Sequence, residues 1–376
     1  MKNLDFIYFD AGGGHRAAAT ALKQVIEKQG RPLTVRMVNL QEKLESIDVF
    51  RRITGLKMED IYNFMLARGY TLGGAQIMAV MHGVIRLFHQ RQVGVLREFW
   101  RSSRPDLVVS LVPNFDRALG ESLRRELPAV PLVTILTDLA DFPPHFWIER
   151  QDQHFICGSD KAVEQALGMG HPAAKVHRVS GMILNPRFYD IPPLSAADRA
   201  AERKRLGFDP GQPVGLILFG GEGAAVMREI ARDLPDRQLL LICGHNDKLR
   251  SRLQAMPHAA PMFVEGFTKE VPRYMQLADY FIGKPGPGSI SEAVHMRLPV
   301  IVERNAWTMP QERYNTEWIR EQGVGLVLPN FRGIAPAVEQ LLDPSNYSRF
   351  RGATERLHNR AVFEIPDILE GILAGQ

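Results

Sequence analysis

Cysteine is scarce in this sequence, because the chain contains only two, Cys157 and Cys243. They lie far apart, and the residues around each are typical of strands. This spacing argues against a disulfide framework and against a cysteine metal site. We therefore expect two buried free thiols in a reducing compartment.

Long hydrophobic runs and targeting patterns are also missing. The most apolar longer stretch, residues 75–85, is interrupted by Gln76, His82 and Gly83. It is far too short to cross a bilayer, so we expect no transmembrane helix. Residues 1–10 show no cationic segment followed by an apolar stretch and a small-residue cleavage site, so we expect no signal peptide.

Net charge is low, at +4, but it is unevenly placed. The low total and the absence of a known nucleic-acid motif argue against a nucleic acid partner. Residues 51–105 contain nine basic and three acidic residues, interleaved with apolar side chains. Two interpretations remain open for this segment: a surface that rests on anionic lipid headgroups, or an ordinary helical pair packed on the core with a basic solvent face.

The length and the residue pattern predict two α/β domains. A chain of 376 residues with 45% apolar residues is long for a single core. Strand-like segments alternate with helical segments, which predicts doubly wound parallel sheets covered on both faces. The expected strands are residues 4–9, 35–40, 107–112, 132–136, 154–157 and 176–179, then 214–219, 239–243, 262–264, 280–282, 300–302 and 325–328.

We place the first domain at residues 1–180, a linker at 181–200 and the second domain at 201–355. Residues 356–376 are expected to form a helix that returns toward the first domain. Ligands bind beyond the carboxyl ends of the strands in such sheets, so two facing domains predict a site in the cleft between them.

Two glycine-rich turns, at residues 11–18 and 283–293, each lead into a helix and lie in opposite halves of the chain. Backbone N–H groups at the positive end of a helix dipole stabilise an anion there. His15 begins the first helix, where a neutral imidazole can take a proton from a hydroxyl. The pair of turns therefore favours group transfer from a nucleotide.

A nicotinamide cofactor is disfavoured. The first turn lacks the G-x-G-x-x-G spacing, and the next strand ends at Asn39-Leu40-Gln41 without an acidic residue for a ribose.

Six motifs, in order and almost from end to end, resemble those of the monogalactosyldiacylglycerol synthases and the related bacterial diacylglycerol glucosyltransferases. A more distant similarity is to the N-acetylglucosaminyltransferase that makes lipid II. The motifs are Gly12-Gly13-Gly14-His15-Arg16-Ala17-Ala18, Leu136-Thr137-Asp138-Leu139, Phe219-Gly220-Gly221-Glu222-Gly223, Gly266-Phe267-Thr268, Lys284-Pro285-Gly286-Pro287-Gly288-Ser289-Ile290-Ser291-Glu292-Ala293 and Pro310-Gln311-Glu312-Arg313-Tyr314-Asn315.

The resemblance implies a GT-B fold, in which two Rossmann-like domains face a cleft. It also implies inverting transfer of a hexose from UDP-galactose or UDP-glucose to diacylglycerol or a related membrane lipid. The N-terminal domain would bind the acceptor and the membrane, and the C-terminal domain would bind the UDP-sugar. The expected location is cytoplasmic, peripheral on the inner face of the cell membrane. No cofactor and no metal are expected.

The resemblance implies that His15 is the general base; the alternative is a residue that caps the turn or contacts a phosphate. Glu292 would bind the ribose, although Ser289-Ile290-Ser291-Glu292 also reads as a capping box. The other residues expected to contact the donor could instead belong to a turn that binds no ligand, to the core (for the phenylalanine) or to a polar loop. They are Gly14, Gly221, Gly223, Gly286, Gly288 and Ser289 for the diphosphate, Phe267 for uracil, and Gln311, Glu312 and Asn315 for the sugar.

Asp138 is expected either to contact the acceptor or to orient His15. His145 and Trp147 resemble acceptor-side residues, with a surface loop around a packed aromatic residue as the alternative. The sequence departs from the relatives at Asn185, where they have arginine, and at Val112, where the plant enzymes have histidine. These departures concern the acceptor more than the donor.

Three other functions remain open at this point. One is a UDP-N-acetylglucosamine epimerase or a nucleotide-sugar hydrolase on the same scaffold, and another is a glycosyltransferase with a soluble acceptor. The third is a non-catalytic protein that binds nucleotide sugars.

Overall fold

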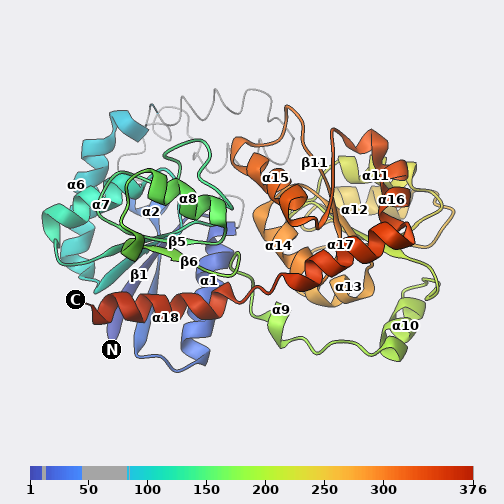
Figure 1. Ribbon diagram of the computed structural model, residues 1–376, viewed down its shortest axis with the longest axis horizontal. Helices are drawn as coiled ribbons and strands as arrows, with labels where there is room; N and C mark the ends of the chain where they lie inside the picture. The colour runs from blue at the N-terminus through green and yellow to red at the C-terminus, as the bar shows by residue number, and fades with distance from the viewer. Residues whose placement is uncertain (11–13, 45–82, 84, 376) are drawn as a thin grey trace.

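The structure is a computed structural model that describes residues 1–10, 14–44, 83 and 85–375. Its N-terminal lobe is built on a six-stranded parallel sheet in the order β2-β1-β3-β4-β5-β6 (Figure 1). The strands are β1 Lys2–Tyr8, β2 Leu33–Asn39, β3 Leu107–Ser110, β4 Leu132–Ile135, β5 His154–Cys157 and β6 Val176–Arg178. The helices around them are α1 Gly14–Lys28, α2 Leu40–Leu44, α6 His89–Ser103, α7 Asp116–Glu126, α8 Asp160–Gly168 and the 3-10 turn η2 Ala173–Lys175.

The C-terminal lobe repeats this architecture with a second six-stranded parallel sheet, in the order β12-β11-β10-β7-β8-β9. The strands are β7 Val214–Leu218, β8 Gln238–Ile242, β9 Met262–Glu265, β10 Tyr280–Gly283, β11 Val300–Glu303 and β12 Gly325–Leu328. The helices are α11 Val226–Asp233, α12 Asp247–Gln254, α13 Val271–Leu277, α14 Pro287–His295, α15 Arg313–Gln322, α16 Ile334–Leu342 and α17 Pro344–Arg356, with the 3-10 turns η3 Pro310–Glu312 and η4 Phe331–Gly333.

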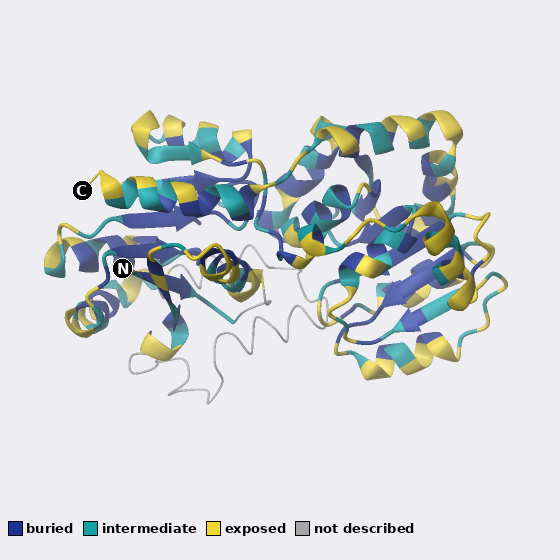
Figure 2. Ribbon diagram, turned by 90° about the horizontal axis from the view of Figure 1, so that it is seen from below, coloured by how far each residue is buried: buried dark blue, intermediate teal, exposed yellow. Residues whose placement is uncertain are grey.

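Burial on both faces explains why the strands are continuous apolar runs. Strands β3, β4, β7, β8 and β10 are buried along their whole length, beneath helices that expose only their outer faces (Figure 2). Apolar residues of α1 pack on one face of the first sheet, and those of α6 and α7 pack on the other. The predicted fold of two doubly wound Rossmann-like domains is confirmed, and each of the twelve predicted strands is present.

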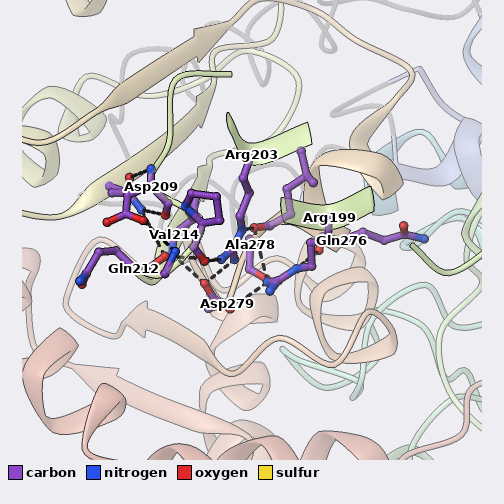
Figure 3. Close-up of polar contacts among 12 residues, drawn as sticks. Arg199, Arg203, Asp209, Gln212, Val214, Gln276, Ala278 and Asp279 are labelled. Carbon is purple, nitrogen blue, oxygen red and sulfur yellow. Dashed lines mark hydrogen bonds and ion pairs between the residues drawn. The ribbon is translucent and has the colours of Figure 1, made fainter. Parts of the chain in front are cut away.

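The segment between the two sheets contains α9 Arg187–Asp190 and α10 Ala196–Arg205. Helix α10 is fastened to the C-terminal lobe, because Arg199 and the buried Arg203 both form ion pairs with Asp279, at 2.8 and 2.5 Å (Figure 3). Both guanidinium groups also donate hydrogen bonds to carbonyls at the end of α13. Only the residues before α10 therefore connect the two lobes without being bonded to the C-terminal lobe in this way, and this stretch is shorter than the expected linker of residues 181–200.

The last helix, α18 Ala361–Ala374, packs against α1, and its side chains join the core of the N-terminal lobe. The chain thus crosses from one lobe to the other twice, and both termini lie on the N-terminal lobe (Figure 1).

Part of the basic segment predicted at residues 51–105 lies outside the described residues, which omit 45–82 and 84. In its described part, Val93, Leu96 and Trp100 of α6 are buried in the core, and Arg97 and Arg101 form ion pairs with Glu126. The described part of the basic segment therefore agrees with the interpretation of a helix packed on the core. Within the described ranges, no helix is both long and apolar enough to cross a membrane.

Both cysteines are buried free thiols, as predicted. Burial raises the pKa of Cys157 to about 12 and that of Cys243 to about 11, so neither thiol is reactive at neutral pH.

Candidate functional site

Each sheet has one point where the strand order reverses, and ligands of doubly wound sheets bind there. The reversal lies between β1 and β3 in the N-terminal lobe and between β7 and β10 in the C-terminal lobe. The loops that leave these four strands carry His15, the segment from Leu111, the Gly220 turn and the Gly286 turn. The fold therefore places the described end of the first glycine-rich turn, from Gly14, and the whole of the second one at positions where such sheets bind ligands.

His15 lies in the first turn of α1 and is partly buried. Its Nδ1 is 3.1 Å from the hydroxyl oxygen of Thr137, and its ring is 5.9 Å from the ring of Trp147. Burial lowers the pKa of His15 to about 4, with a smaller opposing effect from the backbone of Leu111. The imidazole is consequently neutral at physiological pH. Residues 11–13 lie outside the described part, but Gly14 is exposed with open space where a side chain would be.

Asp138 supports this histidine indirectly. The side chain that forms a hydrogen bond with His15 is Thr137, and the role of Asp138 in orienting His15 or in contacting the acceptor stays a prediction. Asp138 Oδ2 accepts a hydrogen bond of 2.9 Å from the indole N–H of Trp147, whose ring lies beside His15. Burial, followed by the nearby carboxylate of Glu312, raises the pKa of Asp138 to about 7, while Trp147 and Lys284 oppose the shift.

Trp147 itself is completely buried, as the alternative of a packed aromatic residue predicts, and its place near the acceptor stays a prediction. The loop that carries it is held by Asp141, whose carboxylate accepts backbone N–H bonds from His145 and Trp147 at 3.0 and 2.6 Å. His145 is exposed, with a positive φ of 65°, and lines a cavity of about 200 Å³ together with Arg117 and Glu149. An acceptor role for His145 remains a prediction.

Helix α14 presents its N-terminus at the reversal point of the C-terminal lobe. Gly286 precedes the helix and Pro287 occupies its first position, so the capping box predicted for Ser289 and Glu292 is wrong. Gly288 is exposed with open space around it, as close approach by a ligand requires. Ser289 follows it in the first turn. The free N–H groups of this turn suit a phosphate.

Glu292 lies one turn further into α14; its backbone carbonyl accepts a hydrogen bond from the N–H of Met296, whereas its side-chain carboxylate has neither a hydrogen bond nor an ion pair with any described residue. Burial raises its pKa to about 7. A partly buried carboxylate without a protein partner is available to accept hydrogen bonds from ligand hydroxyls.

Lys284 is a site residue that the sequence analysis missed. It follows β10 directly, and its Nζ lies 3.1 Å from Glu312 Oε1. Its side chain passes close to Gly286 and Gly220, because a Cβ atom at these glycines would lie 3.2 and 3.8 Å from Lys284 Cε. A lone lysine between a buried strand and a glycine-proline turn is the signal that could have found it.

Two glycines of the turn after β7, Gly221 and Gly223, lie in different surroundings. Gly221 is exposed, and its carbonyl accepts a hydrogen bond of 2.8 Å from the backbone N–H of His245. Gly223 is buried with a φ of +58°, and a Cβ there would lie 2.8 Å from the carbonyl oxygen of Cys243. Gly223 therefore serves the turn and the packing against β8, and its contact with the donor stays a prediction.

Phe267 is 56% exposed and stacks on His245, with ring centroids 4.0 Å apart and planes 16° from parallel. The alternative of a core phenylalanine is wrong. His245, which the sequence analysis did not identify, connects this aromatic pair to the Gly221 turn. Two exposed stacked rings offer a flat surface for a nucleobase.

The segment predicted to bind the sugar forms η3 and the start of α15. Gln311 is largely buried, while the carboxylate of Glu312 forms an ion pair with Lys284. Asn315 is fully buried, and its Nδ2 donates a hydrogen bond of 2.8 Å to the carbonyl of Pro285. This side chain holds the Pro285 turn in place, and a contact of Asn315 with the donor stays a prediction.

The described residues contain no group of three or more histidine, cysteine, aspartate or glutamate side chains arranged to hold a metal ion. The helix dipole of α14 and the ammonium of Lys284 are positive charges that the protein itself supplies to the cleft.

Comparisons with known proteins agree with this arrangement. Residues 216–343 match the glycosyltransferase family 28 C-terminal domain. The chain is 28% identical over 394 residues to the chloroplastic monogalactosyldiacylglycerol synthase of Spinacia oleracea, covering 99% of this chain and 73% of the relative. It is 28% identical over 351 residues to the chloroplastic monogalactosyldiacylglycerol synthase 2 of Arabidopsis thaliana, covering 86% and 70%. Both relatives are named as chloroplastic, and a location on the inner face of a cell membrane stays a prediction for this chain.

Among solved structures, MurG of Acinetobacter baumannii superposes with a TM-score of 0.64 at 12% identity, covering 99% of this chain and 100% of that protein. This likeness shows the GT-B fold. The chain is thus a GT-B glycosyltransferase that carries a family 28 C-terminal domain and is related over most of its length to the monogalactosyldiacylglycerol synthases.

Proposed function

We propose that this protein is an inverting glycosyltransferase that moves a hexose from a UDP-sugar to diacylglycerol or a related membrane lipid. The observation that supports the proposal is that His15 is linked to residues of the other lobe through Trp147 and Asp138, by a ring contact, a hydrogen bond and an electrostatic influence on the pKa of Asp138. His15 lies beside Trp147, Trp147 bonds to Asp138, and Asp138 shares its electrostatic environment with Lys284 and Glu312 of the other lobe. A neutral base and an anion-binding turn therefore face one cleft.

In the proposed reaction, the imidazole of His15 takes the proton of an acceptor hydroxyl. The hydroxyl oxygen forms a bond to the anomeric carbon as the bond from that carbon to the diphosphate breaks, and UDP leaves with the electron pair. A single displacement inverts the anomeric centre. Hydrogen bonding with Thr137 fixes the ring. Positioning of the reactants and proton transfer to a base both contribute to the rate of such reactions.

The donor would lie across the C-terminal lobe. Backbone N–H groups at Gly286, Gly288 and Ser289 would hold the diphosphate at the N-terminus of α14, and Glu292 would accept hydrogen bonds from the ribose hydroxyls. Phe267 would support the uracil ring, with Gly221 close to the phosphates. Gln311 and Glu312 would bond to the sugar hydroxyls, and Gly14 would approach from the N-terminal lobe.

The acceptor and the membrane are proposed from the relatives and from the surface of the N-terminal lobe. The relatives are named for a product that contains diacylglycerol. Leu87 is 78% exposed beside the exposed Arg86 and Arg91, which suits a peripheral contact with anionic headgroups. His145 opens onto the cavity next to this surface and would face the acceptor.

A product screen tests this function. Purified protein is incubated with UDP-galactose or UDP-glucose and with vesicles that contain diacylglycerol, and lipid products are identified by mass. We expect a monohexosyl lipid and UDP, with UDP-galactose as the first donor to examine because of the names of the relatives. Release of free sugar or an epimer without a lipid product would contradict the proposal.

A matched soluble acceptor tests the membrane part. Equal transfer to a soluble acceptor, together with no binding to anionic vesicles, would exclude the lipid surface as the site of action.

A further inference from the structure

Lys284 occupies an unusual position in the cleft. It stands directly after β10, at the reversal point of the C-terminal sheet, and its aliphatic stem passes Gly220 and Gly286. These two glycines belong to the turns where a diphosphate would approach most closely. Its ammonium group, however, lies against Glu312, 3.1 Å away. The cation therefore borders the anion-binding turns while a protein carboxylate holds it.

Glu312 likewise has two possible partners, namely Lys284 and a sugar hydroxyl. It belongs to η3, the segment proposed to bond to the sugar, and its side chain is well covered while that of Lys284 is 38% exposed. While Glu312 accepts the lysine, part of the hydrogen-bonding capacity of its carboxylate is already used and less of it is left for a sugar hydroxyl. Neighbouring Glu312, followed by Asp138 with a smaller effect, raises the pKa of Lys284 against the opposing effect of burial, so the lysine stays charged.

A diphosphate in this cleft would offer Lys284 a second anionic partner besides Glu312. Phosphate oxygens accept strong charge-assisted hydrogen bonds from an ammonium group. The cleft already contains the carboxyl groups of Asp138, Glu292 and Glu312, so a diphosphate without a cationic partner would meet like charges at close range.

We infer that the Lys284–Glu312 ion pair is a holding contact that donor binding exchanges: Lys284 turns to the diphosphate, and Glu312 is released to bond to the sugar. This inference rests on the proposed function. Because Glu312 belongs to the sugar-binding segment, Lys284 holds the phosphate nearest the sugar. Recognition of the diphosphate is thereby coupled to recognition of the sugar, and UMP, which lacks that phosphate, does not trigger the exchange.

The exchange predicts effects of opposite sign for its two partners. Lys284→Met removes a charge-assisted hydrogen bond, so UDP affinity falls by about tenfold or more while UMP affinity is unchanged. Glu312→Gln releases the lysine, so UDP affinity rises although hexose transfer falls. Lys284→Arg retains the preference for UDP over UMP. Lys204→Met, an exposed lysine on α10, is the control and changes neither affinity.

The experiment is calorimetric titration of each full-length variant with UDP and with UMP, without acceptor, after its melting temperature has confirmed a folded protein. A rise in UDP affinity for Glu312→Gln, together with a loss of UDP preference for Lys284→Met, supports the exchange. Unchanged or weaker UDP binding by Glu312→Gln, or an unchanged UDP-to-UMP ratio in Lys284→Met, overturns it. Failure of the unmodified protein to bind UDP at all would contradict the proposed function itself.

Discussion

Burial shifts the titration of single residues in this protein in opposite directions, according to the charge each would carry. It lowers the pKa of His15 to about 4 and raises those of Asp138 and Glu292 to about 7. A base that stays neutral and acids that stay partly protonated coexist at physiological pH. Since His15 is neutral above about pH 4, its titration does not limit activity at neutral pH.

Asp116 shows the same effect outside the cleft. It is buried in the N-terminal lobe, where the hydroxyl of Thr134 donates to its Oδ1 at 3.1 Å. Burial raises its pKa to about 8 from an ordinary value of 3.8. The folded protein thus keeps a proton that the unfolded chain releases, and the free energy of unfolding falls as pH rises through this window.

We predict that Asp116→Asn is more stable than the unmodified protein at pH 8 and equally stable near pH 4. The advantage should reach at least about 1.4 kcal/mol, the equivalent of one pKa unit. Urea unfolding of both proteins between pH 4 and 9 measures it. A stability difference that does not change with pH would show that Asp116 is already ionised in the folded state.

At the scale of elements, the strands could be predicted because a buried parallel strand has to be apolar on both faces. The start of α14 could not be predicted from its serines and glutamate, since Pro287 at the first helical position sets that start. Helix α10 could be predicted from the sequence, but the expected linker of residues 181–200 ends within it. The partners of its arginines lie about 80 residues away, near Asp279, where no local pattern reveals them.

The arginine network of α10 predicts a clear stability effect. Arg203→Met leaves Asp279 partly uncompensated and removes hydrogen bonds from the carbonyls at the end of α13 (Figure 3). We expect a loss of about 3 kcal/mol in the free energy of unfolding, as for other broken buried ion pairs. Lys204→Met, on the exposed face of the same helix, is the matched control. Equal stabilities of the two variants in urea unfolding would contradict this role.

At the scale of the whole molecule, the cleft combines residues that lie hundreds of positions apart. The sequence motifs identified His15, Glu292 and the glycine turns, because these features are local. They did not reveal Lys284 or His245, whose roles depend on Glu312 and Phe267 meeting them in space. The complete burial of Asn315 and Trp147 could not be predicted either, because it depends on packing that a linear pattern does not contain.

The central claim is that a neutral imidazole of the N-terminal lobe serves chemistry while the C-terminal lobe binds the nucleotide. The most direct measurement compares His15→Ala with the unmodified protein, recording hexose transfer to diacylglycerol vesicles and UDP affinity on the same preparations. We predict that transfer falls by about 10² to 10⁴, the usual contribution of a general base, while UDP affinity is unchanged. Transfer that survives the substitution, or that disappears together with UDP binding, would contradict the account.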